Sequence, residues 1–508
     1  MNHKNLLIGY NTFADRIDNV CFYGPATSGG GADWALCHFD PHESVENSCR
    51  QAEKTAERFA ELGMDFVANF EFQNFAEHYT TDDGYDWCNH PDGTHRLNLP
   101  TEYVQAFAKH DNFLGCMYDE MEHVIINRNL SIALNNKKKR IYPMFALHNG
   151  KDVLAQGELL NRQLKEYADT IKASGAPVFA GEHVFPVLYH TFARNGIIPN
   201  FKSQKENFSS LMFAVAAGAA LQYKTPLWNC VDLWHILTNP GHSADEMYYN
   251  LVFSYLAGVN RVYVETSNQF YKTHDDGTTQ ITDYGTQFNR FTQEYRGKER
   301  GYDIQDYRPE IGIVRYDDTF WGQNDPFMWA HILFGNKNIK PDSKAKEWLR
   351  VLHVVSHKST SKHGFGWNKV SPWSLRRHRS FAPMNALAVF DDRVEKDVLE
   401  SLSLCFLCGY HIEKDTLDAV AQLVKENGLT VVTPARFAPH YAAEKVRFGF
   451  AEVRDGKGRW IVARKADDPR VVKRIRPLLG KKDEITLRFK DRALHLKIAK
   501  DGDSFTVL

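Results

Sequence analysis

The sequence predicts a (β/α)₈ barrel, followed by a second α/β domain and a small antiparallel β domain. The chain has 508 residues, which exceeds the usual length of about 100–200 residues for one domain. Short apolar runs alternate with longer helical patterns through about the first 315 residues, and a shorter strand–helix alternation and a stretch of alternating residues follow. We therefore expect the barrel in 1–320, a linker and the α/β domain in 321–440, and the β domain in 441–508.

The strands of the barrel are predicted from apolar runs bounded by polar or turn residues. "NLLIGYNTF" begins the series, and "EIGIVRYDD" ends it. A further strand hidden near 19–37 would change the strand numbers by one. The eight runs lie at 5–13, 64–72, 112–120, 140–147, 177–185, 226–234, 260–267 and 310–318.

Helical patterns lie between these runs. The segments 43–63 and 159–175 each have a charged face and end in a glycine, which is typical of a helix C-terminus. The segment 205–223 is apolar enough for a buried helix, and 243–258 begins with Ser243 and Glu246 at the spacing of a capping box. Strands followed by helices, repeated about eight times over about 315 residues, fit a closed parallel barrel.

Composition and charge exclude several classes of partner. The 62 Lys and Arg residues nearly balance 63 Asp and Glu residues, so no basic excess indicates nucleic acid or an anionic membrane. No run reaches about 18 uncharged apolar residues, and the first residues are too polar for the apolar core of a signal peptide. The chain as given is expected in the cytoplasm, unless a leader has been removed. Eight scattered cysteines do not form a disulfide framework.

Nearly every predicted strand ends in an acid, an amide or a histidine. The segment "NFLGCMYDEMEH" (112–123) is an example, because an apolar run ends there in three carboxylates. Buried carboxylates at strand ends are costly unless they are paired or functional, and the active site of such a barrel lies at these ends. The set comprises Asn11, Glu71, Asp119, Glu120, His148, Glu182, His183, Asp232, Trp234, His235, Glu265, Asp317 and Asp318.

Carboxylates, histidines and aromatic residues in one barrel mouth suit the hydrolysis of glycosidic bonds. We expect Glu120 to be the general acid, although Asp119 or a solvated helix start are alternatives. Glu265 is expected to be the nucleophile or base. The alternative is that it only forms an ion pair with Arg261 or Lys272. Asp232 is expected to be a base or a sugar ligand. The alternative is a structural aspartate held by hydrogen bonds.

The other strand-end residues are predicted to contact the sugar. Trp228 and Trp234 alternate with Asp232 along one strand, so one of them could stack on a sugar ring, with core packing as the alternative. Metal ligation by His183, His235 and the acids has no specific spacing behind it, so we expect neither a metal nor a cofactor. The remaining predicted contacts are Asp119, Asn11, Glu71, His148, Glu182 and Asp317.

Two motifs carry a resemblance to a known family. "NFLGCMYDE" resembles the strand of clan A glycoside hydrolases that ends in Asn-Glu, and "RVYVETSNQF" resembles their later strand that ends in the nucleophile. The strand–helix alternation of 384–434 resembles the amidotransferase-like domain that follows the barrel in family 42 β-galactosidases. The resemblance implies a glycosidase barrel, a flavodoxin-like domain that could form a homo-oligomer contact, and a carbohydrate as partner.

The chain departs from that family in two ways. Asp119 stands where the family has an asparagine. Clan A places its two catalytic glutamates on strands four and seven, whereas Glu120 and Glu265 fall on three and seven, or on four and eight with a hidden strand. Inverting enzymes that resemble family 98 are the second choice, with Asp232 and Glu265 as an acidic pair.

Alternatives to a glycoside hydrolase also stay open. The same barrel could house a lyase, a metal-dependent sugar hydrolase, or a glycan-binding protein without activity. Cys405 and Cys408 form a C-x-x-C within an apolar run and have no nearby set of ligands, which predicts two buried core thiols.

Overall fold

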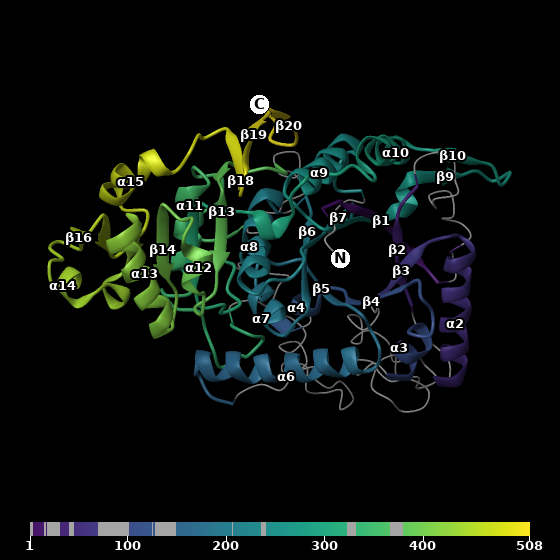
Figure 1. Cartoon of the computed structure of the whole chain (residues 1–508), viewed down its shortest axis with the longest axis horizontal. Helices are drawn as coiled ribbons and strands as arrows, with labels where there is room; N and C mark the ends of the chain where they lie inside the picture. Colours follow the sequence, from purple (N-terminus) through teal and green to yellow (C-terminus); the bar gives the residue numbers. More distant parts are fainter. Residues whose placement is uncertain are drawn as a thin grey trace.

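The computed structural model contains a closed barrel of eight parallel strands (Figure 1). It describes residues 4–14, 17, 31–39, 45–69, 101–123, 125–126, 149–205, 207–234, 240–322, 332–365 and 379–508. Each strand pairs with its sequence neighbours, and β1 closes the barrel on β8. The strands are β1 (Leu7–Phe13), β2 (Trp34–His38), β3 (Asp65–Asn69), β4 (Phe113–Tyr118), β5 (Phe179–His183), β6 (Ile198–Ser203), β7 (Trp228–Asp232) and β8 (Arg261–Glu265).

The predicted barrel is confirmed, but two of its strands differ from the expected set. The strand suspected near 19–37 exists as β2, and β6 was not predicted. The expected strand at 140–147 lies outside the described residues. The run at 310–318 forms β11 (Ile311–Arg315), which pairs with strands of a second sheet, so its assignment to the barrel was wrong. Glu120 therefore follows strand four, and Glu265 ends strand eight.

Helices surround the barrel as the sequence patterns predicted. The helix α8 is almost entirely buried, because it lies between β6 of the barrel and β13 of the second sheet. The capping box of Ser243 and Glu246 is present at the start of α9. These helices are α2 (Val45–Glu61), α3 (Thr101–Phe107), α4 (Met121–His123), α6 (Val153–Ala173), α7 (Tyr189–Arg194), α8 (Ser209–Gln222), α9 (Ala244–Leu256) and α10 (Asp283–Tyr295), with the 3₁₀ turns η4 (Ser267–Phe270) and η5 (Ile304–Asp306).

The second sheet has the strand order β13-β11-β14-β15-β17-β16. Its first five strands are parallel in the order of a flavodoxin-like fold, and β16 joins the edge antiparallel to β17. Cys405 and Cys408 are buried free thiols on β14, as predicted. The strands are β13 (Leu387–Phe390), β14 (Leu404–Cys408), β15 (Thr430–Thr433), β16 (Phe450–Asp455) and β17 (Gly458–Ala463).

The end of the chain forms a smaller sheet of four strands in the order β12-β18-β19-β20. The antiparallel β domain expected in 441–508 therefore shares its first strands, β16 and β17, with the flavodoxin-like sheet. The strands are β12 (Met384–Asn385), β18 (Glu484–Phe489), β19 (Arg492–Ile498) and β20 (Phe505–Val507), and a separate hairpin joins β9 (Tyr271–Thr273) and β10 (Thr279–Ile281). Helices and 3₁₀ turns of this half are α11 (Glu347–Val355), α12 (Lys396–Leu399), α13 (Lys414–Asn427), α14 (His440–Ala443), α15 (Pro469–Ile475), η8 (Ala435–Phe437) and η9 (Arg476–Leu478).

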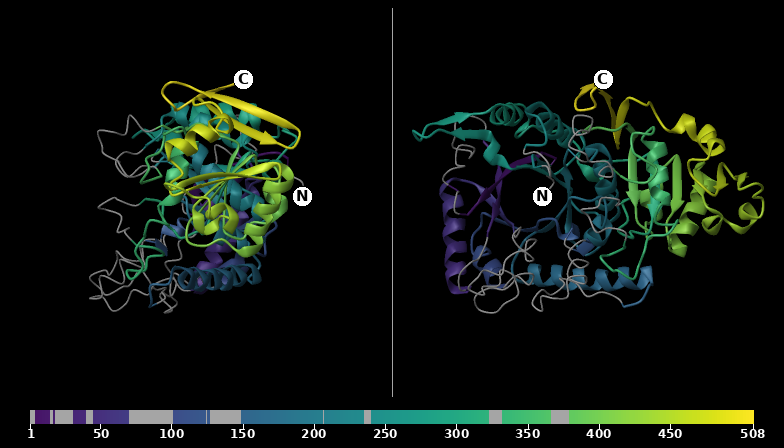
Figure 2. Two further views of the ribbon diagram at one scale, coloured as in Figure 1. Left: turned by 90° about the vertical axis from the view of Figure 1, so that its left-hand side faces the viewer. Right: turned by 180° about the vertical axis from the view of Figure 1, so that it is seen from behind.

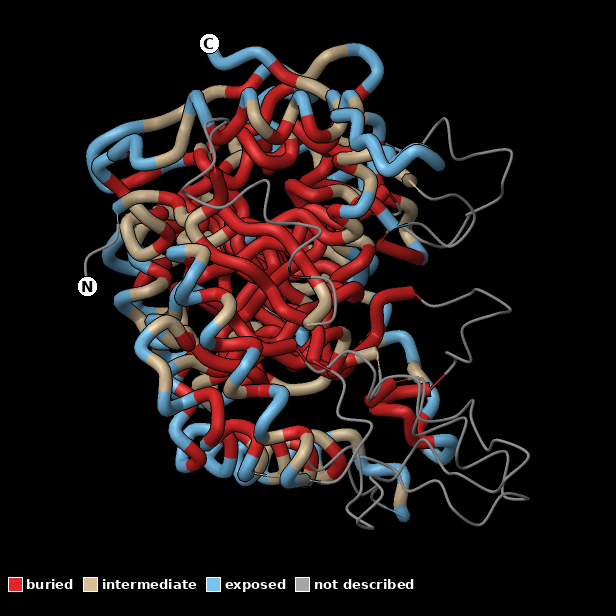
Figure 3. Tube along the Cα trace, turned by 90° about the vertical axis from the view of Figure 1, so that its right-hand side faces the viewer, coloured by how far each residue is buried: buried red, intermediate tan, exposed pale blue. Residues whose placement is uncertain are grey.

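The barrel and the flavodoxin-like domain lie side by side, with the C-terminal sheet along one edge of both (Figure 2). A continuous region of buried chain runs through the middle of the molecule (Figure 3). Among the described residues, no helix is both long and apolar enough to cross a membrane.

Candidate functional site

Each even-numbered strand of the barrel has an inward-pointing polar residue at its C-terminal end or one residue from it. In a strand, residues two apart share a face, so the residue two positions earlier lies one layer deeper. The deeper layer contains Leu36, Met117 and Tyr263, together with Asn200, whose Nδ2 donates to the Tyr263 hydroxyl at 3.1 Å. The layer above, at the mouth, therefore consists of His38, Asp119, Lys202 and Glu265.

The odd-numbered strands follow the same rule. Their deeper layer contains the interior residues Val67, Ala180 and Cys230. Two positions later, the strand ends supply Asn69, Glu182 and Asp232, and β1 supplies Asn11. All eight strands thus contribute a polar side chain above a largely apolar barrel floor.

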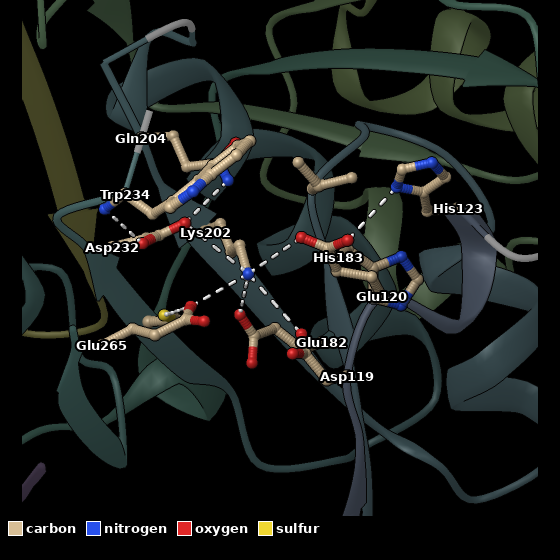
Figure 4. A network of polar contacts seen from close by, with 12 residues as sticks. Asp119, Glu120, His123, Glu182, His183, Lys202, Gln204, Asp232, Trp234 and Glu265 are labelled. Atoms are coloured by element: carbon tan, nitrogen blue, oxygen red, sulfur yellow. Dashed lines mark hydrogen bonds and ion pairs between the residues drawn. The ribbon is translucent and has the colours of Figure 1, made fainter. Parts of the chain in front are cut away.

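The ammonium group of Lys202 lies at the centre of five carboxylates (Figure 4). Its Nζ is 2.8 Å from Glu182, 2.9 Å from Glu265 and 3.1 Å from Glu120. Asp119 and Asp232 lie slightly farther away, at 3.5 and 3.6 Å. The Lys202 side chain is only 2% exposed, whereas those of Glu120 and Glu265 are 22% and 11% exposed. The Lys202 ammonium therefore lies deep in the site, and these two glutamates are the most exposed of the five acids.

Glu120 reaches this cluster through an unusual backbone conformation. It directly follows Asp119, and consecutive residues of a strand would point to opposite faces. Its φ angle is +52°, in the left-handed region, and this turn allows both side chains to contact Lys202. A non-glycine residue in this region costs about 1–2 kcal/mol, and such strain is often found at functional sites.

The charges at the centre change the pKa of both Lys202 and Glu120. Burial alone would lower the pKa of Lys202, but the carboxylates of Asp119, Glu265 and Glu120 hold it well above its usual value. Burial would raise the pKa of Glu120, yet Lys202 and His123 outweigh burial and hold it well below its usual value. The Nδ1 atom of His123 lies 3.2 Å from Glu120. Both charged forms are therefore stable at neutral pH.

Asp232 and Glu265 form a second acidic pair, because their strands place them directly opposite each other. Burial raises the pKa of Asp232 to about 7, and the Glu265 carboxylate adds to this effect. Asp232 accepts hydrogen bonds from the Trp234 backbone at 2.7 Å and from Gln204 at 2.9 Å. The Cys230 thiol donates to Glu265 at 3.2 Å. Asp232 is thus a buried acid that holds a proton below about pH 7.

The opposite wall of the mouth is made of amides and a histidine. Asn11 and Asn69 each place Nδ2 3.2 Å from a different ring nitrogen of His38, and Phe13 stacks on that ring. The backbone and hydroxyl groups of Ser267 donate to Asn11, which ties β1 to the loop after β8. Asn11 therefore lies at the mouth, in a wall made of amides and an imidazole.

His183 and Glu122 lie behind the mouth. Burial lowers the pKa of His183 to about 3, and its Nδ1 pairs with the Val187 carbonyl at 3.0 Å. Glu122 accepts hydrogen bonds from the backbones of Val184 and Phe185, at 2.6 and 2.9 Å, while burial raises its pKa to about 8. These contacts support the loop after β5, so they argue against the predicted sugar contact by His183.

The two candidate tryptophans have different environments. Trp234 is 42% exposed beside Asp232, which suits a sugar platform. Trp228 is fully buried at the start of β7, where it packs near Trp34 and beneath Arg261. The core-packing alternative therefore holds for Trp228, because only the last residues of a barrel strand reach the mouth.

The remaining predicted residues divide into three groups. Asp119 and Glu182 contact Lys202 at the centre of the mouth. Asp317 follows β11 in the second sheet, and its closest ionisable contacts are Arg315 at 3.8 Å and His190 at 4.0 Å, so its expected place in the barrel wall was wrong. Glu71, His148 and His235 lie outside the described residues.

Lys202 is the main functional residue that sequence reasoning missed. His38 and Asn69 were missed as well, because β2 was not located and the run 64–72 was expected to end at Glu71. His38 and Asn69 each stand two places beyond an interior apolar residue, Leu36 and Val67, and that spacing would have found them. Lys202 stands two places beyond the polar Asn200, so the same signal is absent from β6.

Lys202 also decides whether the mouth could hold a metal ion. Glu182, Cys230 and Glu265 have ligand atoms close enough for one cation. However, the Lys202 ammonium already contacts both glutamates at 2.8 and 2.9 Å. The lysine thus supplies the positive charge that these acids require.

The fold is shared with known glycoside hydrolases. An exo-β-1,4-mannosidase from Opitutaceae bacterium strain TAV5 matches 90% of this chain and 91% of its own, with a TM-score of 0.50 and 8% identity. The catalytic module of a family 98 glycoside hydrolase from Streptococcus pneumoniae TIGR4 matches 98% of this chain and 75% of its own, with a TM-score of 0.46 and 9% identity. An exo-carrageenase of family 42 from Bacteroides ovatus matches 97% and 72%, with a TM-score of 0.44 and 10% identity.

At these identities the likeness is one of fold. No protein-family model matches the chain, and no curated protein does. The predicted resemblance to barrel glycoside hydrolases is confirmed at this level.

Proposed function

We propose that this protein hydrolyses O-glycosidic bonds of an oligo- or polysaccharide, with Glu120 as general acid and Glu265 as the second carboxylate. The observation that carries the proposal is that the two most exposed acids of the mouth, Glu120 and Glu265, both contact one buried ammonium group. Glycoside hydrolysis requires two such carboxyl groups on either side of the bond that breaks.

The separation of the two acids supports direct attack by a carboxylate. Glu120 Oε1 and Glu265 Oε2 lie 3.1 and 2.9 Å from the same nitrogen, so they are at most about 6 Å apart. Retaining glycosidases place their carboxyl groups about 5–5.5 Å apart, and inverting ones about 6.5–9.5 Å apart. This upper limit for the nearest oxygens is compatible with the shorter range, and we propose Glu265 as the nucleophile of a retaining reaction.

Strand numbers alone would select a different second acid. With β2 counted, Glu120 follows strand four and Asp232 ends strand seven, the two strands that carry the glutamates in clan A. Glu265 is preferred because Asp232 is buried and occupied by two hydrogen bonds. We propose that, of these two acids, Asp232 is the one that is protonated and Glu265 is the one that is ionised.

Glu120 must gain a proton before it can donate one to the leaving oxygen. His123 offers a path for that proton, because its side chain is 31% exposed and its Nδ1 contacts Glu120 Oε2. We propose that the proton reaches Glu120 through His123 once the sugar binds. Glu120 then protonates the leaving oxygen, and it later activates the water that releases the sugar from Glu265.

The environment of Lys202 favours hydrolysis over the alternatives. A lyase with a lysine base needs a lysine that loses its proton easily, and the surrounding acids have the opposite effect on Lys202. The excess of acids also disfavours an anionic group on the sugar that is cleaved. The cytoplasmic location and the homo-oligomer contact stay predictions.

The test compares the wild type with Glu120→Gln, Glu265→Gln and Asp232→Asn on a panel of glycans, with NMR detection of the first-formed anomer. We expect retention of configuration, and a loss of at least about 10³-fold in kcat for both glutamine variants. Asp65→Asn is the matched control, because Asp65 begins β3 at the opposite end of the barrel. If Glu265→Gln keeps full activity and Asp232→Asn loses it, the nucleophile is Asp232 and not Glu265. Binding without turnover on every glycan would refute the hydrolase.

A further inference from the structure

A second cluster of ligand-type residues lies at the C-terminal edge of the flavodoxin-like sheet. Asp392 follows β13, while His411 and Glu413 follow β14. These two strands pair with β11 on opposite sides, so the chain changes direction at β11. Parallel sheets commonly bind ligands at such a switch point, beyond the carboxyl ends of the strands.

The geometry of the three side chains fits one cation. One ligand atom from each residue lies within 4.8 Å of the other two. The Glu413 backbone donates to the Asp392 carbonyl at 2.9 Å, which holds the two loops together. The side chains of His411 and Glu413 are 37% and 48% exposed, so both can rotate toward a shared ion.

Asp392 provides the independent evidence for a ligand. Its side chain is almost fully buried, and its Oδ2 accepts no hydrogen bond. The Nε atom of Arg393 lies 4.0 Å from this oxygen, which is beyond hydrogen-bond distance, and the Nη2 atom of Arg393 contacts Glu158. The neighbouring Asp391 takes the hydrogen bonds of Arg194 and Tyr223. A buried carboxylate oxygen without a donor is costly, and a bound cation removes that cost.

We propose that Asp392, His411 and Glu413 bind a divalent cation of the zinc type and thereby tie the loop after β13 to the loop after β14. Imidazole favours zinc and similar transition metals, whereas calcium and magnesium prefer oxygen ligands alone. One imidazole and two carboxylates also give the three protein ligands of a tetrahedral zinc site with one remaining position. This proposal does not depend on glycoside hydrolysis.

The experiment is a calorimetric titration of the full chain with ZnCl₂ after treatment with EDTA. His411→Ala and Glu413→Gln change exposed side chains, so both variants are expected to fold. His440→Ala is the matched control, because His440 and Glu444 form a similar surface pair with the same 3.5 Å separation as His411 and Glu413. A parallel titration uses CaCl₂, and anomalous diffraction at the zinc edge locates the ion.

We expect the wild type and His440→Ala to bind one more zinc ion than His411→Ala. Glu413→Gln should weaken that site at least tenfold, and an anomalous peak should lie between the three side chains. Equal zinc binding by the wild type and His411→Ala would overturn the proposal. Binding of calcium but not zinc at this position would overturn the assigned metal class.

Discussion

Replacing Lys202 with methionine should destabilise the protein in a manner that depends on pH. Methionine keeps the length and the apolar stem of lysine but removes its charge from the five carboxylates. At the 2.8–3.1 Å contacts to Glu182, Glu265 and Glu120, each attraction amounts to about 5–6 kcal/mol at an effective dielectric constant of about 20. Desolvation of the ammonium and repulsion between the acids offset most of this sum.

The expected net loss is about 3–5 kcal/mol at pH 8, the usual cost of removing one partner from a buried ion pair. Without the lysine, the folded protein raises the pKa of these carboxyl groups above their values in the unfolded chain. The folded variant then retains protons that the unfolded chain releases, so its stability falls as pH rises above about 4. The difference from the wild type should therefore be larger at pH 8 than at pH 5.

Thermal and urea unfolding at both pH values would measure this difference. Lys165→Met is the matched control, because Lys165 pairs with Asp169 on the exposed face of α6 at 2.7 Å. That change should cost no more than about 0.5 kcal/mol at either pH. If Lys202→Met unfolds like the wild type at pH 8, or loses the same stability at both pH values, the argument that Lys202 neutralises ionised acids is refuted.

Three further outcomes follow from the contacts described. Trp234→Ala should raise KM about tenfold without changing the melting temperature, and an unchanged KM would exclude Trp234 as the sugar platform. Trp228→Ala should instead cost about 3–5 kcal/mol of stability, because Trp228 is buried in the core. Because burial raises the pKa of Glu122 to about 8, the folded state retains a proton and loses stability as pH rises from about 4.3 to 8. In thermal unfolding, the stability of Glu122→Gln should therefore fall less steeply with pH over this range than that of the wild type. An identical pH dependence for the two proteins would contradict the raised pKa of Glu122. Asp391→Asn should cost about 3–5 kcal/mol, since Arg194 bonds this buried acid across the two domains; an unchanged melting temperature would contradict that role.

The fold could be predicted largely from the alternation of strands and helices, and the exceptions have physical reasons. The strand β6 reads Ile-Pro-Asn-Phe-Lys-Ser, and its proline and polar residues are unusual in a strand. It forms because the closed barrel pairs it with β5 and β7 and buries all six residues. The strand β11 has the apolar pattern of a buried parallel strand, and that pattern cannot distinguish a barrel from a neighbouring parallel sheet.

The acids of the site could be predicted, but the lysine that holds them could not be located without β6. A lysine within a polar segment is usually exposed, so its own neighbours gave no indication of burial. The indication lay elsewhere, in Asp119, Glu182, Asp232 and Glu265. Their convergence at one barrel mouth, together with Glu120, requires a cation, because several ionised carboxylates cannot share a buried site without one. Each strand offers its interior positions at every second residue, and Lys202 stands two residues beyond the buried Asn200. A set of converging carboxylates in a barrel sequence therefore also predicts a basic residue at an interior position near the end of another strand.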